Sequence, residues 1–348
     1  MSKSARSSLT WLAFLTKAEA AKMIRKLSER TNLGLLAVTV ALFAVMSIGY
    51  SHFLTLYNLE VIAMGFVQEA IMALGMTVVI ISGGIDLSVG SVLVFSSILV
   101  GLFLKAKLGI AVSIILTLGI AGCIGFANAA MINRLRAHPF IVTLGTMTVV
   151  RGFALVLTGG HPVTGFPKSF SYFGQGYLFN IPFPVVLFVF LAVTFHILLG
   201  RNKYFAQAYF IGSNPDAARL CSMNVERFRW VTYVISAILA GAAGIITASQ
   251  YISANASFGL DAELRVITAV IVGGASLSGG VGTIGRTVLG VIFLAIVANA
   301  LVQANVPTYW EKVAYGAMLV VSVMLEQYLR YKRTGVKEVW KDFMLGGG

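Results

Sequence analysis

Long apolar segments recur along almost the whole chain, and they constrain its fold more than any other feature. Hydrophobic residues make up 58% of the 348 residues, and charged residues only 11%, against about 25% in a typical soluble domain. About 20 apolar residues cross the hydrocarbon core of a membrane as a helix. Ten segments approach this pattern, the eighth being short: 33–53, 59–81, 85–104, 109–132, 139–158, 183–199, 230–249, 264–275, 285–304 and 311–329. The sequence therefore predicts an all-α, polytopic membrane protein with about ten transmembrane helices.

Basic residues gather in three stretches between or beyond the apolar segments, and they give the chain a net charge of +13. Clusters of this kind indicate the cytoplasmic side of a membrane protein. The stretches hold Lys3, Arg6, Lys17, Lys22, Arg25, Lys26 and Arg30; Arg201, Lys203, Arg219, Arg227 and Arg229; and Arg330, Lys332, Arg333, Lys337 and Lys341. No basic–aromatic module accompanies the charge, which argues against nucleic acid as a partner.

The charge pattern predicts three regions and an orientation. Residues 1–32 would form a cytoplasmic tail with an amphipathic helix on the membrane surface, 33–330 the transmembrane domain and 331–348 a second cytoplasmic tail. Alternation from a cytoplasmic N-terminus assigns the remaining segments. It places 133–138 and 200–229 inside, and 159–182, 250–263 and 305–310 outside. The outside segment 159–182 is either a connector or a docking surface for an external partner.

A glycine motif occurs twice, once in each half of the chain. ISGGIDLSVGS at Ile81–Ser91 aligns with VGGASLSGGVG at Val272–Gly282 through the shared pattern G-G-x-x-L-S-x-G. Matched interruptions of apolar segments are typical of discontinuous helices beside a transport pathway, although glycines also let helices pack closely. The sequence predicts a two-fold internal repeat. The span count makes it parallel, and an inverted repeat would need one miscounted span.

The polar residues inside the apolar segments are candidates for the pathway or for the broken helices, because such groups face a cavity or a partner. Asp86 is interpreted as an anchor that caps the backbone around Ser88, in preference to a substrate contact. Each polar residue taken alone more often makes a helix–helix hydrogen bond than a ligand contact. The candidates are Gly83, Gly84, Asp86, Ser88, Asn128, Thr143, Gly273, Gly274, Ser276, Ser278 and Asn299.

The stretch GVGTIGRT at Gly280–Thr287 resembles the phosphate-binding loop G-x-x-x-x-G-K-[ST], with Arg286 in place of the lysine. A working loop of this type connects a buried strand to a helix in a soluble domain, whereas this stretch lies between two apolar segments. Arginine also does not replace the compact lysine ammonium at that position. We therefore expect no cofactor in this chain, and any ATP and Mg would be bound by a partner ATPase. No metal-ligand spacing or nucleophile–base pair is found, so neither a metal site nor catalytic residues are predicted.

The basic segment 200–229 carries the pattern of a short capped helix. Asn214 is a predicted N-cap, Pro215 the first helical residue, and Asp216 complements the helix dipole. A short helix between two spans could be the binding site of a soluble protein that drives transport. An ordinary surface loop is the alternative. The candidate coupling residues are Asn214, Pro215, Asp216, Ala217, Ala218, Arg219 and Leu220.

Four stretches together resemble a known family. They are GMTVVIISGGIDLSVGS at Gly75–Ser91, HPFIVTLGTMTVVRG at His138–Gly152, FIGSNPDAARLCSMNV at Phe210–Val225 and VIVGGASLSGGVGTIG at Val270–Gly285. Over about residues 35–330 the chain resembles the permease subunits of bacterial ABC importers for ribose, galactose, xylose and autoinducer 2. This resemblance implies a multi-pass protein of the bacterial inner membrane that passes a monosaccharide or small polyol inwards. The implied partners are a cytoplasmic ABC ATPase, a second permease copy and a periplasmic sugar-binding protein.

The family's coupling element, D/E-A-A after G-x-N-P, maps onto Asp216, Ala217 and Ala218. The chain departs from the family at three places, with GSN for GGN at 212–214, CSM for SGI at 221–223, and GLDAELR at 259–265 where YELDA is usual. The last difference leaves open the identity of the sugar and any role for Asp261, and the pairing of the two permeases is open as well. An ion-coupled secondary transporter or channel is the alternative function, suggested by Glu69, Asp86 and Glu263.

Overall fold

The structure is a computed structural model that describes residues 33–334. The predicted surface helix of the tail 1–32 and most of the tail 331–348 lie outside the described residues. The longer helices are Leu33–Gly49, α2 Leu56–Ile81, α3 Val89–Lys105, α4 Ile110–Arg134, α5 Pro139–Thr158, α7 Phe183–Arg201, α10 Val225–Tyr251, α11 Ala262–Val272, α12 Ile284–Gln303 and α13 Tyr309–Thr334. The short elements are β1 Val163–Thr164, η1 Lys168–Ser171, α6 Tyr172–Gln175, β2 Tyr177–Leu178, β3 Ile181–Pro182, α8 Lys203–Ser213, α9 Pro215–Leu220 and β4 Ser253–Ala254.

The helices confirm the prediction of an all-α membrane protein. Six of them, α2, α4, α5, α7, α10 and α12, are long and apolar enough to cross a membrane. Leu33–Gly49 and α3 are shorter apolar helices. The third predicted segment, 85–104, begins too early, because the chain turns after α2 and α3 starts only at Val89. The short eighth segment corresponds to α11, which has 11 residues.

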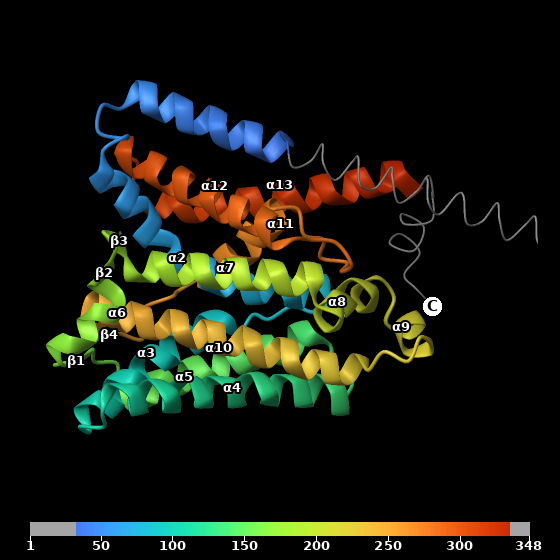
Figure 1. Cartoon of the computed structure of the whole chain (residues 1–348), viewed down its shortest axis with the longest axis horizontal. Coiled ribbons are helices and arrows are strands. Elements are labelled where there is room, and N and C mark those ends of the chain that lie inside the picture. Colours follow the sequence, from blue (N-terminus) through green and yellow to red (C-terminus); the bar gives the residue numbers. More distant parts are fainter. Residues whose placement is uncertain (1–32, 335–348) are drawn as a thin grey trace, which may run out of the picture.

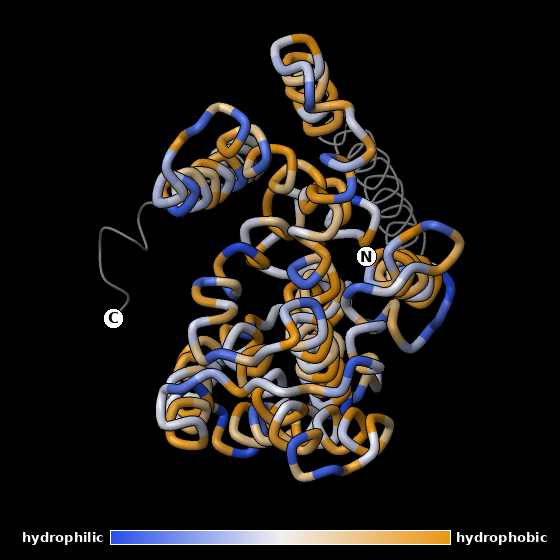
Figure 2. Tube along the Cα trace, turned by 90° about the vertical axis from the view of Figure 1, so that its left-hand side faces the viewer, coloured by the Kyte–Doolittle hydropathy of each residue, from blue (hydrophilic) through white to orange (hydrophobic). Residues whose placement is uncertain are grey.

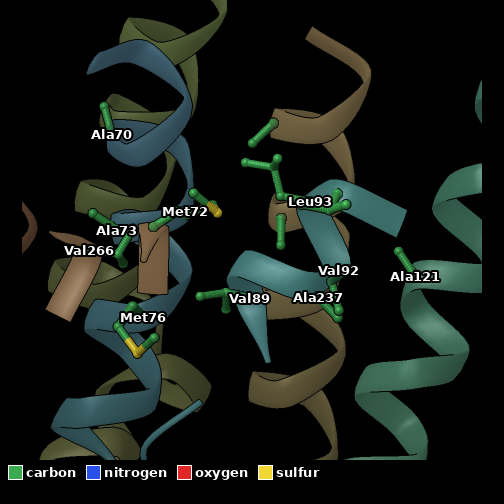
Figure 3. Close-up of a cluster of buried hydrophobic side chains, with 14 of the residues drawn as sticks. Ala70, Met72, Ala73, Met76, Val89, Val92, Leu93, Ala121, Ala237 and Val266 are labelled. Carbon is green, nitrogen blue, oxygen red and sulfur yellow. The ribbon is translucent and has the colours of Figure 1, made fainter. Parts of the chain in front are cut away.

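Two helices form the centre of the bundle. In its most apolar window, 83% of α2 is buried and 72% of α10, against 17% for both α5 and α7. α10 packs against α2, α3 and α4, and the side chains between these helices form the main core cluster. Figure 3 shows this cluster, with Met72 and Met76 from α2, Val92 from α3 and Ala121 from α4. The outer helices α4, α5 and α7 therefore expose most of their apolar surface, as lipid-facing helices do.

The connecting segments gather at two opposite ends of the bundle (Figure 1), and a view from one of these ends shows hydrophobic residues in most of the helical turns (Figure 2). At one end, β1 of the segment 159–182 pairs antiparallel with β4 of the segment 250–263, in the register Val163↔Ala254. At the other end, Asn133 Nδ2 donates to the carbonyl of Glu226 at 3.0 Å. Segments that the charge pattern assigns to one side of the membrane thus lie at one end of the structure.

Candidate functional site

The two glycine turns lie against each other and against the end of α8. The amide of Gly280, in the second turn, donates to the carbonyl of Ile81, where the first turn begins, at 2.8 Å. Gly212, near the end of α8, is wedged between them, since a Cβ built on it would lie 1.9 Å from the Ile81 oxygen and 2.6 Å from the Gly280 nitrogen. Gly83 and Gly279 adopt positive φ angles of 79° and 80°, which glycine takes at low cost. Only a residue without a side chain fits between these two turns.

Asp86 is the centre of a buried polar network behind the first turn. Its Oδ1 accepts from the amide of Ser88 at 3.0 Å and from the Ser88 hydroxyl at 2.6 Å. Its Oδ2 accepts from Ser236 of α10 at 2.9 Å. The network continues because Asn128 of α4 donates to Ser88 Oγ at 3.0 Å and Thr146 of α5 donates to Asn128 at 2.6 Å. The carboxylate is fully enclosed, and it ties the start of α3 to three other helices.

The other polar candidates from the sequence do not join this network. Asn299 of α12 exchanges hydrogen bonds with Asn58 of α2, at 2.9 and 3.1 Å, in a separate buried cluster that also contains Gln303. Thr143 donates to the carbonyl of Pro139 in its own helix at 2.9 Å. Ser276 bonds to Glu326 of α13. The candidate residues are therefore distributed over at least three places, and the structure does not bring them into one pocket.

The second turn differs from the first in its helical surroundings. Gly273 and Gly290 bring α11 and α12 into direct contact, since a Cβ on Gly273 would lie 2.5 Å from the Arg286 carbonyl oxygen and one on Gly290 would lie 2.1 Å from that of Ala269. Around the first turn, α2 and α3 both pack on α10 instead. In the second turn, Gly274 has a φ of 90°, and the amide of Ser278 donates to Ser276 Oγ at 3.2 Å. In the first turn, Gly84 packs on the Tyr233 hydroxyl, where a Cβ would lie at 2.9 Å.

The helix α9 has the predicted cap. Asn214 accepts from the amides of Asp216 and Ala217 at 3.1 and 3.0 Å, and Pro215 is the first residue of the helix. Arg219 binds both Asp216, at 2.8 Å, and Glu226 at the start of α10, at 2.9 Å. The hydrogen bonds to Glu226 and Asp216 raise the pKa of the Arg219 guanidinium. The bond to Glu226 clamps the short helix onto the end of a long one, and the bond to Asp216 lies within α9.

The two sides of α9 have different surroundings. Ala218 is 3% exposed and contacts the core cluster that contains Ile211 and Phe228. Leu220 is 88% exposed, and Asp216 and Ala217 are exposed as well. The surface that α9 offers to a partner therefore includes Asp216, Ala217 and Leu220, together with the exposed Asn214, Pro215 and Arg219, while Ala218 fixes the helix to the protein.

Two ion pairs at the opposite end were missed by the sequence analysis. Arg265 Nη2 lies 2.8 Å from Glu69 Oε1, and Arg151 Nη2 lies 3.8 Å from Glu263 Oε2. Both carboxylates belong to residues that suggested an ion-coupled transporter, and each has an arginine beside it. The available signal was the presence of Glu69, Arg151 and Arg265 inside apolar segments, because such charges require a partner.

Comparisons with known proteins identify a family and several relatives. The model of the branched-chain amino acid transport system / permease component family matches residues 58–323. The chain belongs to this permease family. The permease is 35% identical to a ribose import permease of Bacillus subtilis over 288 residues, covering 82% of this chain and 89% of the relative.

Two further relatives are similar over most of the permease. An L-arabinose ABC transporter permease of Azospirillum brasilense is 31% identical over 304 residues, 87% of this chain and 90% of the relative. An autoinducer 2 import system permease of Klebsiella pneumoniae subsp. pneumoniae is 33% identical over 321 residues, 90% of this chain and 95% of the relative. No solved structure matches the chain.

Proposed function

We propose that this permease is the membrane-spanning subunit of an ATP-driven importer, and that it passes a monosaccharide or a related small polyol into the cytoplasm. The observation that carries the proposal is the similarity over more than four fifths of the chain to permeases named for ribose, L-arabinose and autoinducer 2. A separate cytoplasmic ABC ATPase binds ATP and Mg. A second permease copy and a periplasmic sugar-binding protein complete the importer.

In this proposal α9 is the coupling helix, and its end of the bundle faces the cytoplasm together with both chain termini. The exposed residues Asp216, Ala217 and Leu220 contact the ATPase. Movement of α9 passes through α8 to Gly212, which touches both glycine turns. We propose that these turns are the two copies of an internal repeat and lie beside the substrate pathway of about ten spans. Their common contact with α8 supports this arrangement.

The alternative, an ion-coupled transporter or channel, is less well supported by the charges within the bundle. Glu69 and Glu263 lie beside Arg265 and Arg151, and Asp86 is enclosed by hydrogen-bond donors. A cation that bound to Glu69 or Glu263 would have to displace the neighbouring arginine. The alternative predicts gradient-driven flux by the purified chain alone in proteoliposomes. The importer requires ATP, the ATPase and the binding protein, so uptake by the chain alone would contradict it.

The exposed surface of α9 gives a direct test of coupling. Leu220→Glu is expected to reduce co-purification of the ATPase at least tenfold, since it places a charge in an apolar contact. Phe179→Glu is the matched control, because Phe179 is 90% exposed at the opposite end of the bundle. Both variants should insert normally. Equal ATPase recovery for Leu220→Glu and Phe179→Glu would rule out α9 as the coupling helix.

A further inference from the structure

A cavity of about 730 Å³ opens where α4 ends and α5 and α10 begin. Three arginines line it, Arg136, Arg219 and Arg229, together with one carboxylate, Glu226. Three positive charges against Glu226 and Asp216, which both pair with Arg219, leave an excess of one positive charge. The cavity therefore favours an anionic occupant by charge alone.

The three arginines differ in how many of their N–H groups already bond to other residues. Arg219 is held by Asp216 and Glu226. Arg229 donates Nη1 to Asn133 at 2.8 Å. Arg136 is exposed, has a positive φ of 51°, and makes no hydrogen bond or ion pair with any residue of the described range. A guanidinium has five donors in a planar fork that matches the oxygens of a phosphate or carboxylate, so Arg136 holds a free anion-binding group at the cavity.

The start of α5 adds to this positive potential. Pro139 and His138 line the same cavity, and Pro139 is the first residue of a helix of 20 residues. The N-terminus of a helix carries a partial positive charge. The anion preference therefore arises from two independent sources, the arginine side chains and a long helix.

Exposed apolar residues next to the lining residues Arg136 and Pro139 in the chain indicate which kind of anion the cavity would bind. Leu135, Phe140 and Ile141, in the connection between α4 and α5 and the first turn of α5, are 73%, 44% and 68% exposed. Both helices are candidate membrane spans, so this rim lies where a span meets the membrane surface. A free inorganic anion would use only the arginines, whereas an amphiphile with an anionic head would use the apolar rim as well. Basic pockets between spans recognise anionic lipid headgroups in this way.

We propose that this cavity binds the headgroup phosphate of an anionic phospholipid, with Arg136 and Arg229 on the phosphate and the acyl chains along Leu135, Phe140 and Ile141. The lipid would sit beside Arg219, which clamps α9. Binding of the lipid would therefore affect α9, the helix that we assign to ATPase coupling. The binding site itself does not depend on the transported substrate or on the direction of transport.

Native mass spectrometry of the full chain, in micelles containing phosphatidylglycerol or phosphatidylcholine, tests the proposal. We expect the wild type to retain phosphatidylglycerol in preference to phosphatidylcholine. Arg136→Gln should weaken retention about tenfold, because it removes a charge-assisted contact, and Arg136→Lys should restore part of it. Arg134→Gln is the matched control, because Arg134 is exposed at the end of α4 but does not line the cavity. Arg229→Gln provides a second, independent variant.

Three results would overturn the proposal. The first is equal retention of the two lipids, or equal retention by Arg136→Gln and Arg134→Gln. The second is binding of glycerol 3-phosphate, a headgroup without acyl chains, as tightly as phosphatidylglycerol, which would identify the site as a soluble-anion site. The third is a loss of ATPase co-purification in Arg136→Gln with lipid retention unchanged, which would assign the arginine to the ATPase interface.

Discussion

Substituting Gly212 with alanine would test the contact between α8 and the two glycine turns. The new methyl carbon would lie 1.9 Å from the Ile81 oxygen and 2.6 Å from the Gly280 nitrogen. Neither neighbour is the tip of a flexible side chain, so the backbone has to move. The hydrogen bond from Gly280 to Ile81, now 2.8 Å long, has to lengthen or break. The variant therefore separates the turns that the wild type holds together.

The expected cost follows from three contributions. Overpacking a tight site costs about 1–3 kcal/mol, and a buried backbone group left without its partner costs about 1–3 kcal/mol. Replacing glycine by alanine inside a helix returns about 1 kcal/mol. We expect a net destabilisation of roughly 1–5 kcal/mol.

Gly200→Ala is the matched control for this variant. Gly200 lies in α7 close to the same end of the bundle, and a Cβ there meets nothing within 4 Å. It should be neutral or slightly stabilising. Thermal unfolding of the purified variants measures stability, and the ratio of substrate uptake to ATP hydrolysis in the reconstituted importer measures coupling. The Gly212→Ala variant should lower both, and unfolding temperatures and coupling ratios equal to those of Gly200→Ala would refute the contact.

Three further predictions address two buried polar clusters and one exposed ion pair. Asp86→Asn should lower the unfolding temperature, at a cost of about 1–3 kcal/mol, because the amide presents a donor where serine hydroxyls already donate; an unchanged melting curve would contradict the anchor role. In a double-mutant cycle, Asn58→Ala and Asn299→Ala should be non-additive by about 0.5–3 kcal/mol, and additive losses would show that the two amides act independently. The hydrogen bond from Lys312 holds the pKa of Asp261 below its usual range, so this pair adds stability above about pH 3.9 that is lost as the pH falls through the lower folded-state pKa. Asp261→Asn should remove that small pH dependence of the unfolding temperature, and an unaltered acid profile would disprove it.

The sequence predicted the helices and their grouping better than the contacts between them. Apolar length located α2, α4, α5, α7, α10 and α12, since each of these helices contains one long window of high mean hydropathy. The pattern Asn-Pro-Asp predicted the cap of α9, because capping depends only on residues within one turn. Both features are local, and local features are what a single sequence records directly.

The missed features involve residues far apart in the chain. Ser236 is 150 positions from Asp86, and no local pattern indicates that it completes the carboxylate's hydrogen bonds. The sequence likewise did not show that Ala218 faces inward and Leu220 outward. A helix of six residues is too short for its apolar face to be read from periodicity. Its orientation depends on the neighbours that the fold supplies.

The glycines of the two turns are better explained by the joint with α8 than by close helix packing alone. If glycine served only to bring helices together, each turn would need small residues on its own helix faces. Gly273 does pack α11 against α12, but the backbone of the second turn also reaches the backbone at the start of the first, and Gly212 from a third segment fills the space between them. Three backbones meet with no side chain in between, so a displacement of α8 cannot be absorbed by rotamer changes. Behind the first turn, the Asp86 network fixes the start of α3 to α4, α5 and α10. A push on α9 is therefore expected to move α8 and the two turns together, and not one turn alone.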